Sequence, residues 1–215
     1  MNTLELLEIG PVIPVIVIDD VATAADLARA LVAGHIRALE ITLRSPTALE
    51  AIRVIRDEVP EAVVGVGTVR TPAQLDAALR AGARFGVSPG LTEDLARAAS
   101  TAGVPFLPGV ATASEAMRAA ELGFGALKLF PAEAAGGAAL LKSWLGPLPD
   151  LMFCPTGGVH AGNMASYLAL PNVRCVGGSW LTPPAAVRDH DWDAITGLAR
   201  QAVALGAVGS GAPGS

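Results

Sequence analysis

The stretch GFGALKLFPAEAAGG, residues 123–137, places a lysine in the middle of its most apolar part. The five residues from Ala126 to Phe130 have the composition of a short buried strand, bounded by Gly125 and Pro131. Lysines are rarely buried unless they are paired, and Lys128 is one of only two lysines in the chain. An amine in apolar surroundings can lose its proton and attack a carbonyl carbon, which a guanidinium cannot do. The stretch therefore predicts a Schiff-base lysine. The structural alternative is a lysine that extends to solvent from a strand end.

Short apolar runs alternate with Ala-rich amphipathic segments on both sides of this stretch. Units of this kind, repeated every ~20 to 26 residues, predict a (β/α)8 TIM barrel, an α/β fold, over residues 1–205. A short helix, Thr3–Glu8, precedes it, and Trp192–Ala204 forms its last helix. The alternative is a doubly wound open sheet. Such a sheet typically has a GxGxxG turn after its first strand, where this chain has Ile18-Asp19-Asp20. The expected strands are Val12–Ile18, Ala38–Leu43, Val63–Gly67, Arg84–Ser88, Pro105–Pro108, Ala126–Phe130, Leu151–Cys154 and Val173–Gly177.

The bulk composition excludes several classes of protein. The chain has 215 residues, of which 52% are apolar, but no apolar run reaches the ~18 residues of a membrane span. A net charge of −5 without a basic stripe argues against nucleic acid as a partner. Cys154 and Cys175 lie in apolar runs and, with no visible signal peptide, indicate a cytoplasmic protein. Three scattered histidines give no metal-ligand spacing, so no metal site is expected. The Gly/Ser-rich segment 206–215 is expected to be a disordered tail.

Period-2 alternation places charged side chains at the barrel mouth. Glu40, Thr42 and Arg44 share one face of the second strand, while leucine and isoleucine occupy the other. The same rule puts Lys128 on the face of Ala126 and Phe130. Lysine, glutamate and arginine are therefore expected to converge on one cavity. The alternative is a buried ion pair that has only a structural role.

Glycine pairs end the last two strands. Thr156-Gly157-Gly158 and Gly177-Gly178-Ser179 occupy the places where barrels often bind a phosphate group. Exposed backbone N–H groups and two hydroxyls suit a phosphate. The sequence therefore predicts a phosphate site between these two loops.

Motifs at successive strand ends carry a family resemblance. They are LEITLR at 39–44, GVGT at 65–68, SPG at 88–90, ALKLFPAE at 126–133, FCPTGG at 153–158 and CVGGSW at 175–180. From about residue 9 to residue 204 the chain resembles the 2-keto-3-deoxy-6-phosphogluconate (KDPG) aldolase / 4-hydroxy-2-oxoglutarate aldolase family. The resemblance implies a class I aldolase with a (β/α)8 barrel. It also implies a homotrimer, no metal and no cofactor.

The resemblance also implies roles for individual residues. Lys128 would form the imine with the C2 ketone, and Glu40 would be the proton shuttle. Arg44 and Thr68 would hold the pyruvate carboxylate in a pocket walled by Phe130 and Pro89. The phosphate would be bound by Gly157, Gly158, Gly178 and Ser179, with Thr156 contacting the hydroxyl-bearing part of the substrate. Two departures from the family pattern, Val66 and His160, touch none of these roles.

Three activities stay open at this point. The first is cleavage of KDPG to pyruvate and glyceraldehyde 3-phosphate, for which Pro155-Thr156 favours the gluconate over the galactonate epimer. The second is cleavage of 4-hydroxy-2-oxoglutarate to pyruvate and glyoxylate by the same lysine. The third is a non-catalytic phosphate-binding barrel or an assembly subunit, in which Lys128 would be unreactive.

Overall fold

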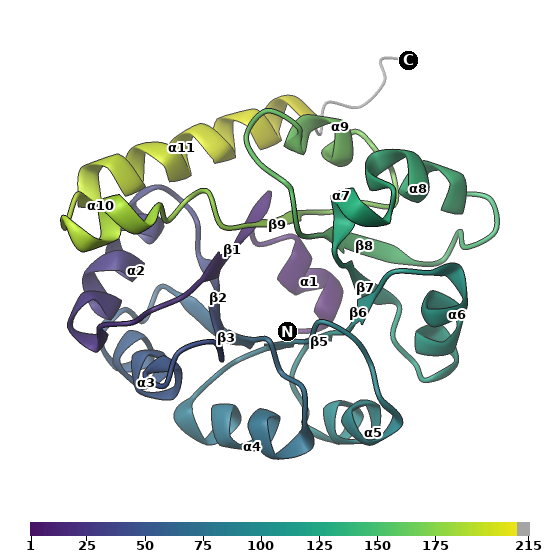
Figure 1. The fold of residues 1–215 in the computed structure, drawn as a ribbon, viewed down its shortest axis with the longest axis horizontal. Helices are drawn as coiled ribbons and strands as arrows, with labels where there is room; N and C mark the ends of the chain where they lie inside the picture. The colour runs from purple at the N-terminus through teal and green to yellow at the C-terminus, as the bar shows by residue number, and fades with distance from the viewer. Residues whose placement is uncertain (210–215) are drawn as a thin grey trace.

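Parallel strands close into a ring, and the helices that follow the first strand lie outside it (Figure 1). The computed structural model describes residues 1–209. One sheet has the order β5-β4-β3-β2-β1-β9, and a second has the order β6-β7-β8. The bridge Thr156↔Gly177 joins the end of β8 to β9 of the first sheet, and a second bridge, Phe153↔Val173, lies beside it. The fold is therefore the expected (β/α)8 TIM barrel. Its strands are β1 (Val12–Ile16), β2 (Ala38–Thr42), β3 (Val63–Gly67), β4 (Gly86–Val87), β5 (Phe106–Leu107), β6 (Gly109–Val110), β7 (Ala126–Leu129), β8 (Met152–Pro155) and β9 (Val176–Gly178).

Side-chain caps begin several of the outer helices. At α4 the Thr71 hydroxyl accepts a hydrogen bond from the Gln74 amide, and Pro72 occupies the first helical position, where a missing amide hydrogen costs no helical bond. Thr92 and Thr112 cap α5 and α6 in the same way. The helices are α2 (Ala24–Ala33), α3 (Ala48–Glu58), α4 (Pro72–Ala81), α5 (Glu93–Thr101), α6 (Ala113–Glu121), α7 (Ala132–Ala135), α8 (Gly137–Trp144), α9 (Met164–Leu168), α10 (Pro184–Arg188) and α11 (Trp192–Gly209), with a 3-10 turn η1 (Val21–Thr23) before α2.

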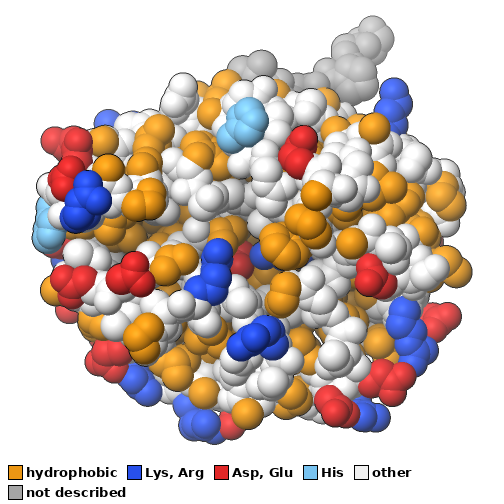
Figure 2. Space-filling model, in the orientation of Figure 1, with side chains coloured by type: hydrophobic (Ala, Val, Ile, Leu, Met, Phe, Trp, Pro, Cys, Tyr) orange, Lys and Arg blue, Asp and Glu red, His pale blue; other side chains and the backbone are white. Residues whose placement is uncertain are grey.

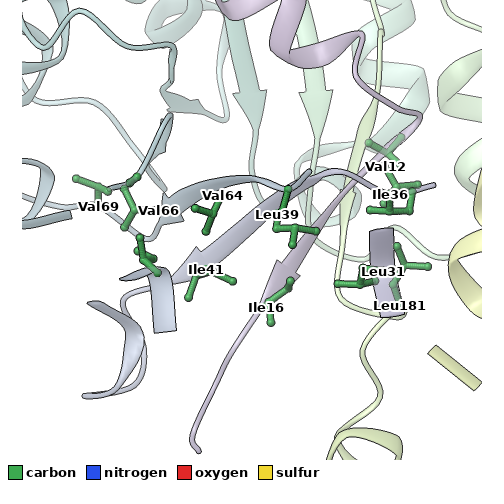
Figure 3. Packing of buried hydrophobic residues seen from close by; sticks show 14 of the residues in the cluster. Val12, Ile16, Leu31, Ile36, Leu39, Ile41, Val64, Val66, Val69 and Leu181 are labelled. Carbon is green, nitrogen blue, oxygen red and sulfur yellow. The ribbon is translucent and has the colours of Figure 1, made fainter. Parts of the chain in front are cut away.

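Two apolar clusters result from the alternation along the strands. The larger one fills the layer between strands and helices, and Figure 3 shows Leu39, Ile41 and Val64 of the strands within it. The smaller one lies inside the ring and includes Ala38 and Ala126, which lie two residues before Glu40 and Lys128. The alternation that the sequence predicts for β2 and β7 is therefore confirmed.

Helix α1 (Thr3–Leu7) closes the amino-terminal end of the barrel. Asn2 and Glu5 form a reciprocal capping box at its start. Leu6 and Leu7 are fully buried and pack into the inner cluster with Ile13. In the view of Figure 1, α1 lies within the ring of strands. This plug leaves the carboxyl ends of the strands as the end at which a site can form.

The fifth strand differs from its predicted form. Instead of one segment, Pro105–Pro108, the structure has β5 and β6 in succession, with β5 paired to β4 and β6 paired to β7. The neighbouring strand changes at Pro108, because proline has no amide hydrogen to donate to a sheet. The Pro108 carbonyl oxygen accepts a hydrogen bond from Lys128 N at 2.8 Å. This change of partner is what continues the sheet to the lysine strand.

Helix α11 extends beyond the predicted end of the domain at residue 205. It continues to Gly209 and thus includes the first part of the segment expected to be a disordered tail, so that expectation is wrong for residues 206–209. Gly206 packs so closely on Pro11 that an added Cβ atom would overlap the proline ring. Contact with the start of the barrel is the tertiary reason for the extension. The remainder of the predicted tail lies outside the described residues.

A close contact between α2 and α11 gives a prediction for stability. A Cβ atom added at Gly34, which ends α2, would overlap Ala199 and lie 2.9 Å from the Thr196 carbonyl oxygen. We therefore expect Gly34→Ala to lower the free energy of unfolding by about 1–3 kcal/mol. Gly197→Ala is the control, because that position in α11 has nothing within 4 Å of the new atom. The control should leave stability unchanged or raise it by up to ~1 kcal/mol. Urea unfolding of both variants checks this, and equal stabilities would contradict the prediction.

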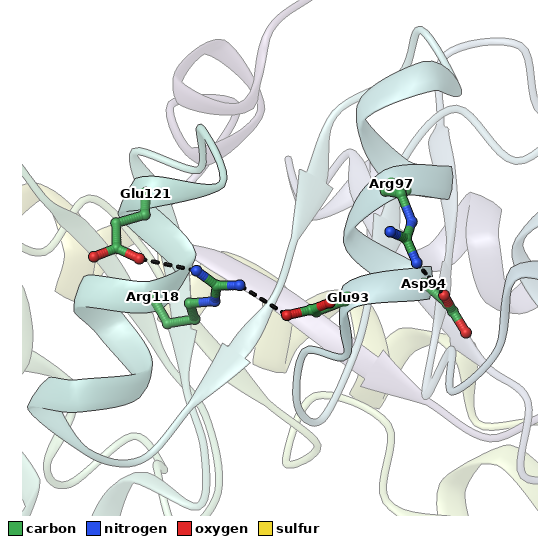
Figure 4. A network of polar contacts seen from close by, with 5 residues as sticks. All are labelled: Glu93, Asp94, Arg97, Arg118 and Glu121. Atoms are coloured by element: carbon green, nitrogen blue, oxygen red, sulfur yellow. Dashed lines mark hydrogen bonds and ion pairs between the residues drawn. The ribbon is translucent and has the colours of Figure 1, made fainter.

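Exposed ion pairs link neighbouring outer helices. Arg118 of α6 binds Glu121 on its own helix at 3.0 Å and Glu93 of α5 at 2.8 Å (Figure 4). Arg97 and Asp94 form a separate pair on α5. Pairs this exposed contribute little to stability, so the barrel depends on its two apolar clusters. Among residues 1–209, no helix is both long and apolar enough to cross a membrane.

Candidate active site

Strands β2 and β7 bring Glu40 and Lys128 together inside the barrel. The Lys128 Nζ atom lies 3.3 Å from the Glu40 Oε1 atom. Their residues are only 5% and 3% exposed, so the two charges form a buried ion pair. Such a pair adds little net stability compared with apolar residues of the same volume. Its position at the carboxyl ends of the strands makes it a candidate for chemistry.

Glycine at position 67 makes room for this pair. Gly67 is the register partner of Thr42 on the neighbouring strand, and an added Cβ atom there would overlap the Glu40 carboxylate. The sequence analysis placed Gly67 only at a strand end and missed this role. The period-2 pattern holds the signal, because it puts Gly65 and Gly67 on the inner face of β3.

The predicted pocket walls lie at the same end of the barrel. The Phe130 ring lies at the end of β7, with its centroid 5.4 Å from Lys128 Nζ. Pro89 follows β4, and a side chain at Gly109 would overlap its backbone. Both Phe130 and Pro89 are partly exposed, as residues that line an open mouth should be.

The predicted carboxylate-binding residues lie at the rim. Arg44 is exposed in the turn after β2, and its guanidinium makes no hydrogen bond or ion pair within residues 1–209. Thr68 directly follows β3 and has φ +60°, a value that is rare for a β-branched residue. The structure thus brings lysine and glutamate into contact, whereas the arginine lies exposed in the turn after β2. In Figure 2, acidic and basic side chains show inside a hollow near the middle of the face, and further basic side chains stand around it.

The two predicted phosphate loops lie side by side. The bridge between Thr156 and Gly177 joins the ends of the last two strands. Gly157 and Gly158 have φ values of +98° and +81°, which favour glycine. Gly178 leaves room for the Trp180 ring, since an added Cβ atom would overlap it.

The hydroxyls of these loops differ in exposure. Thr156 is buried, whereas Ser179 is exposed. Ser179 also lines a cavity of about 540 Å³ between the end of β1 and α10. An exposed hydroxyl beside paired glycines has the donors that an anion requires.

A contact beside the phosphate loop was not predicted. The Tyr167 hydroxyl of α9 donates a hydrogen bond to the Glu133 carboxylate of α7. Burial, and then this bond, raises the pKa of the Tyr167 phenol above its ordinary value. In the sequence Glu133 only follows the lysine strand, and no local signal marks a partner so distant along the chain.

Cys154 and Cys175 are neighbours in the inner cluster. Both thiols are free and buried. A hydrogen bond with the Cys154 side chain, and then burial, raise the pKa of the Cys175 thiol well above its ordinary value. The Cys175 side chain therefore packs as a neutral, apolar group. In the described part of the chain, no three histidine, cysteine or acidic residues are grouped to hold a metal ion.

The fold and the buried pair together define a class of protein. A TIM barrel that holds a lysine amine beside a carboxylate at the carboxyl ends of its strands has the parts of a barrel lyase of the aldolase type. Comparison with known proteins then gives the family. The model of the KDPG and KHG aldolase family matches residues 4–198.

Three similar proteins agree with that match. The 2-dehydro-3-deoxy-phosphogluconate aldolase of Pseudoalteromonas atlantica is 53% identical over 200 residues, which cover 93% of each chain. The crystal structure of KDPG aldolase from Legionella pneumophila, with pyruvate captured as a covalent carbinolamine intermediate, has a TM-score of 0.93 and 44% identity. The match covers 94% of this chain and 98% of that one. The Zymomonas mobilis enzyme with 3-phosphoglycerate has a TM-score of 0.91 and 46% identity, over 95% of this chain and 96% of its own. The chain belongs to the KDPG and KHG aldolase family and is a carbon–carbon lyase.

Proposed function

We propose that the chain cleaves KDPG to pyruvate and D-glyceraldehyde 3-phosphate through an imine on Lys128. The observation that carries this proposal is the 3.3 Å contact between Lys128 and Glu40, buried at the catalytic end of the barrel. The family match supports the substrate, because relatives of about half identity are named for it.

Lys128 supplies the nucleophile. In its neutral form the amine attacks the C2 ketone, and loss of water from the carbinolamine leaves a protonated imine. The imine accepts electrons more readily than the ketone does. Glu40 lies within hydrogen-bond distance of the amine. It can take the proton that the amine gives up and pass it to the carbinolamine hydroxyl, which leaves as water, so that Glu40 is again a carboxylate.

Glu40 then moves the proton that breaks the carbon–carbon bond. Its carboxylate removes the C4 hydroxyl proton, directly or through one water molecule. The C3–C4 bond breaks, C4 becomes the aldehyde carbon of glyceraldehyde 3-phosphate, and the electron pair passes through C3 to the imine nitrogen. Returning the proton to C3 of the enamine and hydrolysing the imine release pyruvate and restore the amine.

The rim residues hold the ends of the substrate. The Arg44 guanidinium can bind the carboxylate through two hydrogen bonds, and Thr68 adds a hydroxyl. Phe130 and Pro89 wall the pyruvate pocket. The loops with Gly157, Gly158, Gly178 and Ser179 bind the phosphate through backbone N–H groups and one hydroxyl, while Thr156 contacts the hydroxyl-bearing carbons.

A second activity uses the same lysine. The Lys128–Glu40 pair requires only the 2-oxo acid part of a substrate, and the family model includes KHG aldolases. Cleavage of 4-hydroxy-2-oxoglutarate to pyruvate and glyoxylate is therefore the second candidate. It makes no use of the phosphate loops, and this difference separates the two substrates.

The test is pyruvate release coupled to lactate dehydrogenase. We expect the wild-type chain to release pyruvate from KDPG with a higher kcat/KM than from 4-hydroxy-2-oxoglutarate. If pyruvate is released from 4-hydroxy-2-oxoglutarate but not from KDPG, 4-hydroxy-2-oxoglutarate is the substrate and the proposal for KDPG is wrong. Absence of release from both would support a non-catalytic phosphate-binding barrel.

Ser179→Ala should weaken binding of the phosphorylated substrate alone. Loss of one hydrogen bond to a charged phosphate is expected to raise the KM for KDPG about tenfold. The KM for 4-hydroxy-2-oxoglutarate should stay within about twofold, since that substrate has no phosphate. Ser143→Ala, an exposed serine on α8, is the control and should change neither constant. An equal change of KM with both substrates would show that Ser179 does not bind the phosphate.

The family resemblance supports a proposed assembly, and the cysteine usage supports a proposed location. The proposed state is a homotrimer in the cytoplasm, with small-molecule substrates as its partners. Two buried free thiols agree with a reducing compartment. Sedimentation at several concentrations tests the trimer, and a monomer that retains full activity would contradict a catalytic need for it.

A further inference from the structure

We infer that Tyr167 and Glu133 are positioning residues that fix the Gly157-Gly158 loop for a phosphorylated substrate. The inference rests on the proposed function and assigns a role to residues that the mechanism above does not use. It starts from the backbone. The segment after β7 is joined to the loop by two hydrogen bonds, from Ala132 N to Thr156 O at 2.7 Å and from Glu133 N to Gly157 O at 3.0 Å.

The Glu133 side chain then lies directly on the loop. A Cβ atom added at Gly158 would be 2.6 Å from Glu133 Cγ and 2.7 Å from Glu133 Cβ. These distances leave no space between the loop backbone and the methylene groups of the glutamate. Any movement of Glu133 must therefore disturb Gly158, which supplies one of the N–H groups proposed to bind phosphate.

Tyr167 holds Glu133 from the side of α9. The tyrosine is 0% exposed, and its hydroxyl donates to the Glu133 Oε1 atom. Its raised pKa keeps the phenol protonated, and thus a donor, throughout the neutral range. A buried ring cannot follow a moving loop, so this bond ties Glu133 to a rigid part of the barrel.

The other side of the loop is also tied to the start of α9. Asn163 Nδ2 donates to the Gly158 carbonyl at 3.1 Å, and Asn163 Oδ1 accepts from His160 N at 2.8 Å. Gly158 is therefore fixed from both sides, by Glu133, which Tyr167 of α9 holds, and by Asn163 at the start of the same short helix. Backbone N–H groups bind an anion well only when they are held in place beforehand.

The position of the Glu133 carboxylate also affects how well the loop binds a phosphate. A carboxylate that packs against the phosphate loop repels a phosphate dianion, and the repulsion grows as the two groups approach each other. The bond from Tyr167 uses one carboxylate oxygen and determines where this charge lies. Without that bond, both the order of the loop and the separation of the two anions are lost.

Steady-state kinetics of Tyr167→Phe test the inference. The ring stays, only the hydroxyl is removed, and Tyr167 is the single tyrosine of the chain. We expect the KM for KDPG and the inhibition constant of inorganic phosphate to rise about fivefold each, with kcat within about twofold. The KM for 4-hydroxy-2-oxoglutarate should not change.

A control variant separates positioning from general loss of stability. Thr196→Val removes a hydrogen bond, from the hydroxyl to the Ala30 carbonyl at 2.9 Å, on the outer helix α11. It should lower the melting temperature as Tyr167→Phe does and leave both KM values unchanged. Equal KM changes with the two substrates in Tyr167→Phe, or no change with either, would overturn the inference.

The proposed function fails in a different way. If the wild type releases no pyruvate from KDPG, that function is wrong, and the positioning role is then judged by thermal stabilisation with inorganic phosphate. A smaller stabilisation of Tyr167→Phe than of wild type supports the role, and equal stabilisation overturns it. If the wild type cleaves KDPG and Tyr167→Phe does so with the same KM, only the positioning role is overturned.

Discussion

Lys128→Ala is expected to abolish pyruvate release from KDPG, with kcat/KM falling at least about 10⁴-fold. The methyl group that remains can form no imine, so no electron sink develops beside C3. The same loss is expected with 4-hydroxy-2-oxoglutarate, because both substrates need the imine. Coupled assays with lactate dehydrogenase measure both losses in the same cuvette.

The chain supplies a matched control for this substitution. Lys142 is its only other lysine and is exposed on α8. Lys142→Ala should keep wild-type kinetics. After borohydride reduction in the presence of pyruvate, a peptide map of the wild type should show the adduct on Lys128 and none on Lys142. An adduct on Lys142, or full activity in Lys128→Ala, would contradict the assignment of the nucleophile.

Stability must be measured beside activity in this variant. Removing the amine leaves the Glu40 carboxylate buried without its partner, which is expected to lower the free energy of unfolding by about 3 kcal/mol. Assays should therefore run well below the melting temperature of Lys128→Ala. A folded variant with no activity supports the chemical role, and the wild-type adduct locates it independently.

Alternation along the strands explains how the central pair could be predicted. Side chains on β2 and β7 point in and out in turn, so Leu39 and Leu127 in the outer layer imply Glu40 and Lys128 inside. Parallel strands in one barrel end at the same face, and this brings the two together although they are far apart in sequence. The prediction needed no knowledge of loops.

Alternation no longer predicts side-chain positions beyond the end of a strand. Arg44 follows β2 in a turn, and there the alternation no longer determines where a side chain lies. It was expected in the cavity with Lys128, and it is an exposed rim residue. The change of strand at Pro108 and the extension of α11 along Pro11 likewise depend on tertiary neighbours, which no local pattern encodes.

Contacts between loops lie still further from what periodicity can predict. The Tyr167–Glu133 bond joins α9 to α7, and neither residue stands on a strand. The sequence shows only that Glu133 follows the lysine strand. The barrel and its reactive pair are thus predictable from strand patterns, whereas the arrangement that supports the phosphate loop requires the structure.

Glu40→Gln is expected to separate the two halves of the mechanism. The amide keeps the shape of the side chain and can still accept a hydrogen bond from the lysine amine. It cannot take up a proton at neutral pH, so KDPG cleavage should fall by about 10² to 10⁴-fold. Pyruvate should still be trapped on Lys128 by borohydride, because the imine forms without the step that breaks the bond.

Hydrogen exchange at the methyl group of pyruvate identifies Glu40 as the shuttle. In D₂O the wild type should exchange these hydrogens through the enamine, and Glu40→Gln should lose exchange and cleavage by the same factor, since one group serves both proton transfers at C3 and C4. Glu50→Gln, an exposed glutamate on α3 paired with Arg53, is the control and should change neither rate. If exchange persists while cleavage is lost, another group protonates C3, and Glu40 serves only the C4 hydroxyl. If cleavage persists, the contact between Glu40 and Lys128 is structural, and the proton shuttle lies elsewhere at the barrel mouth.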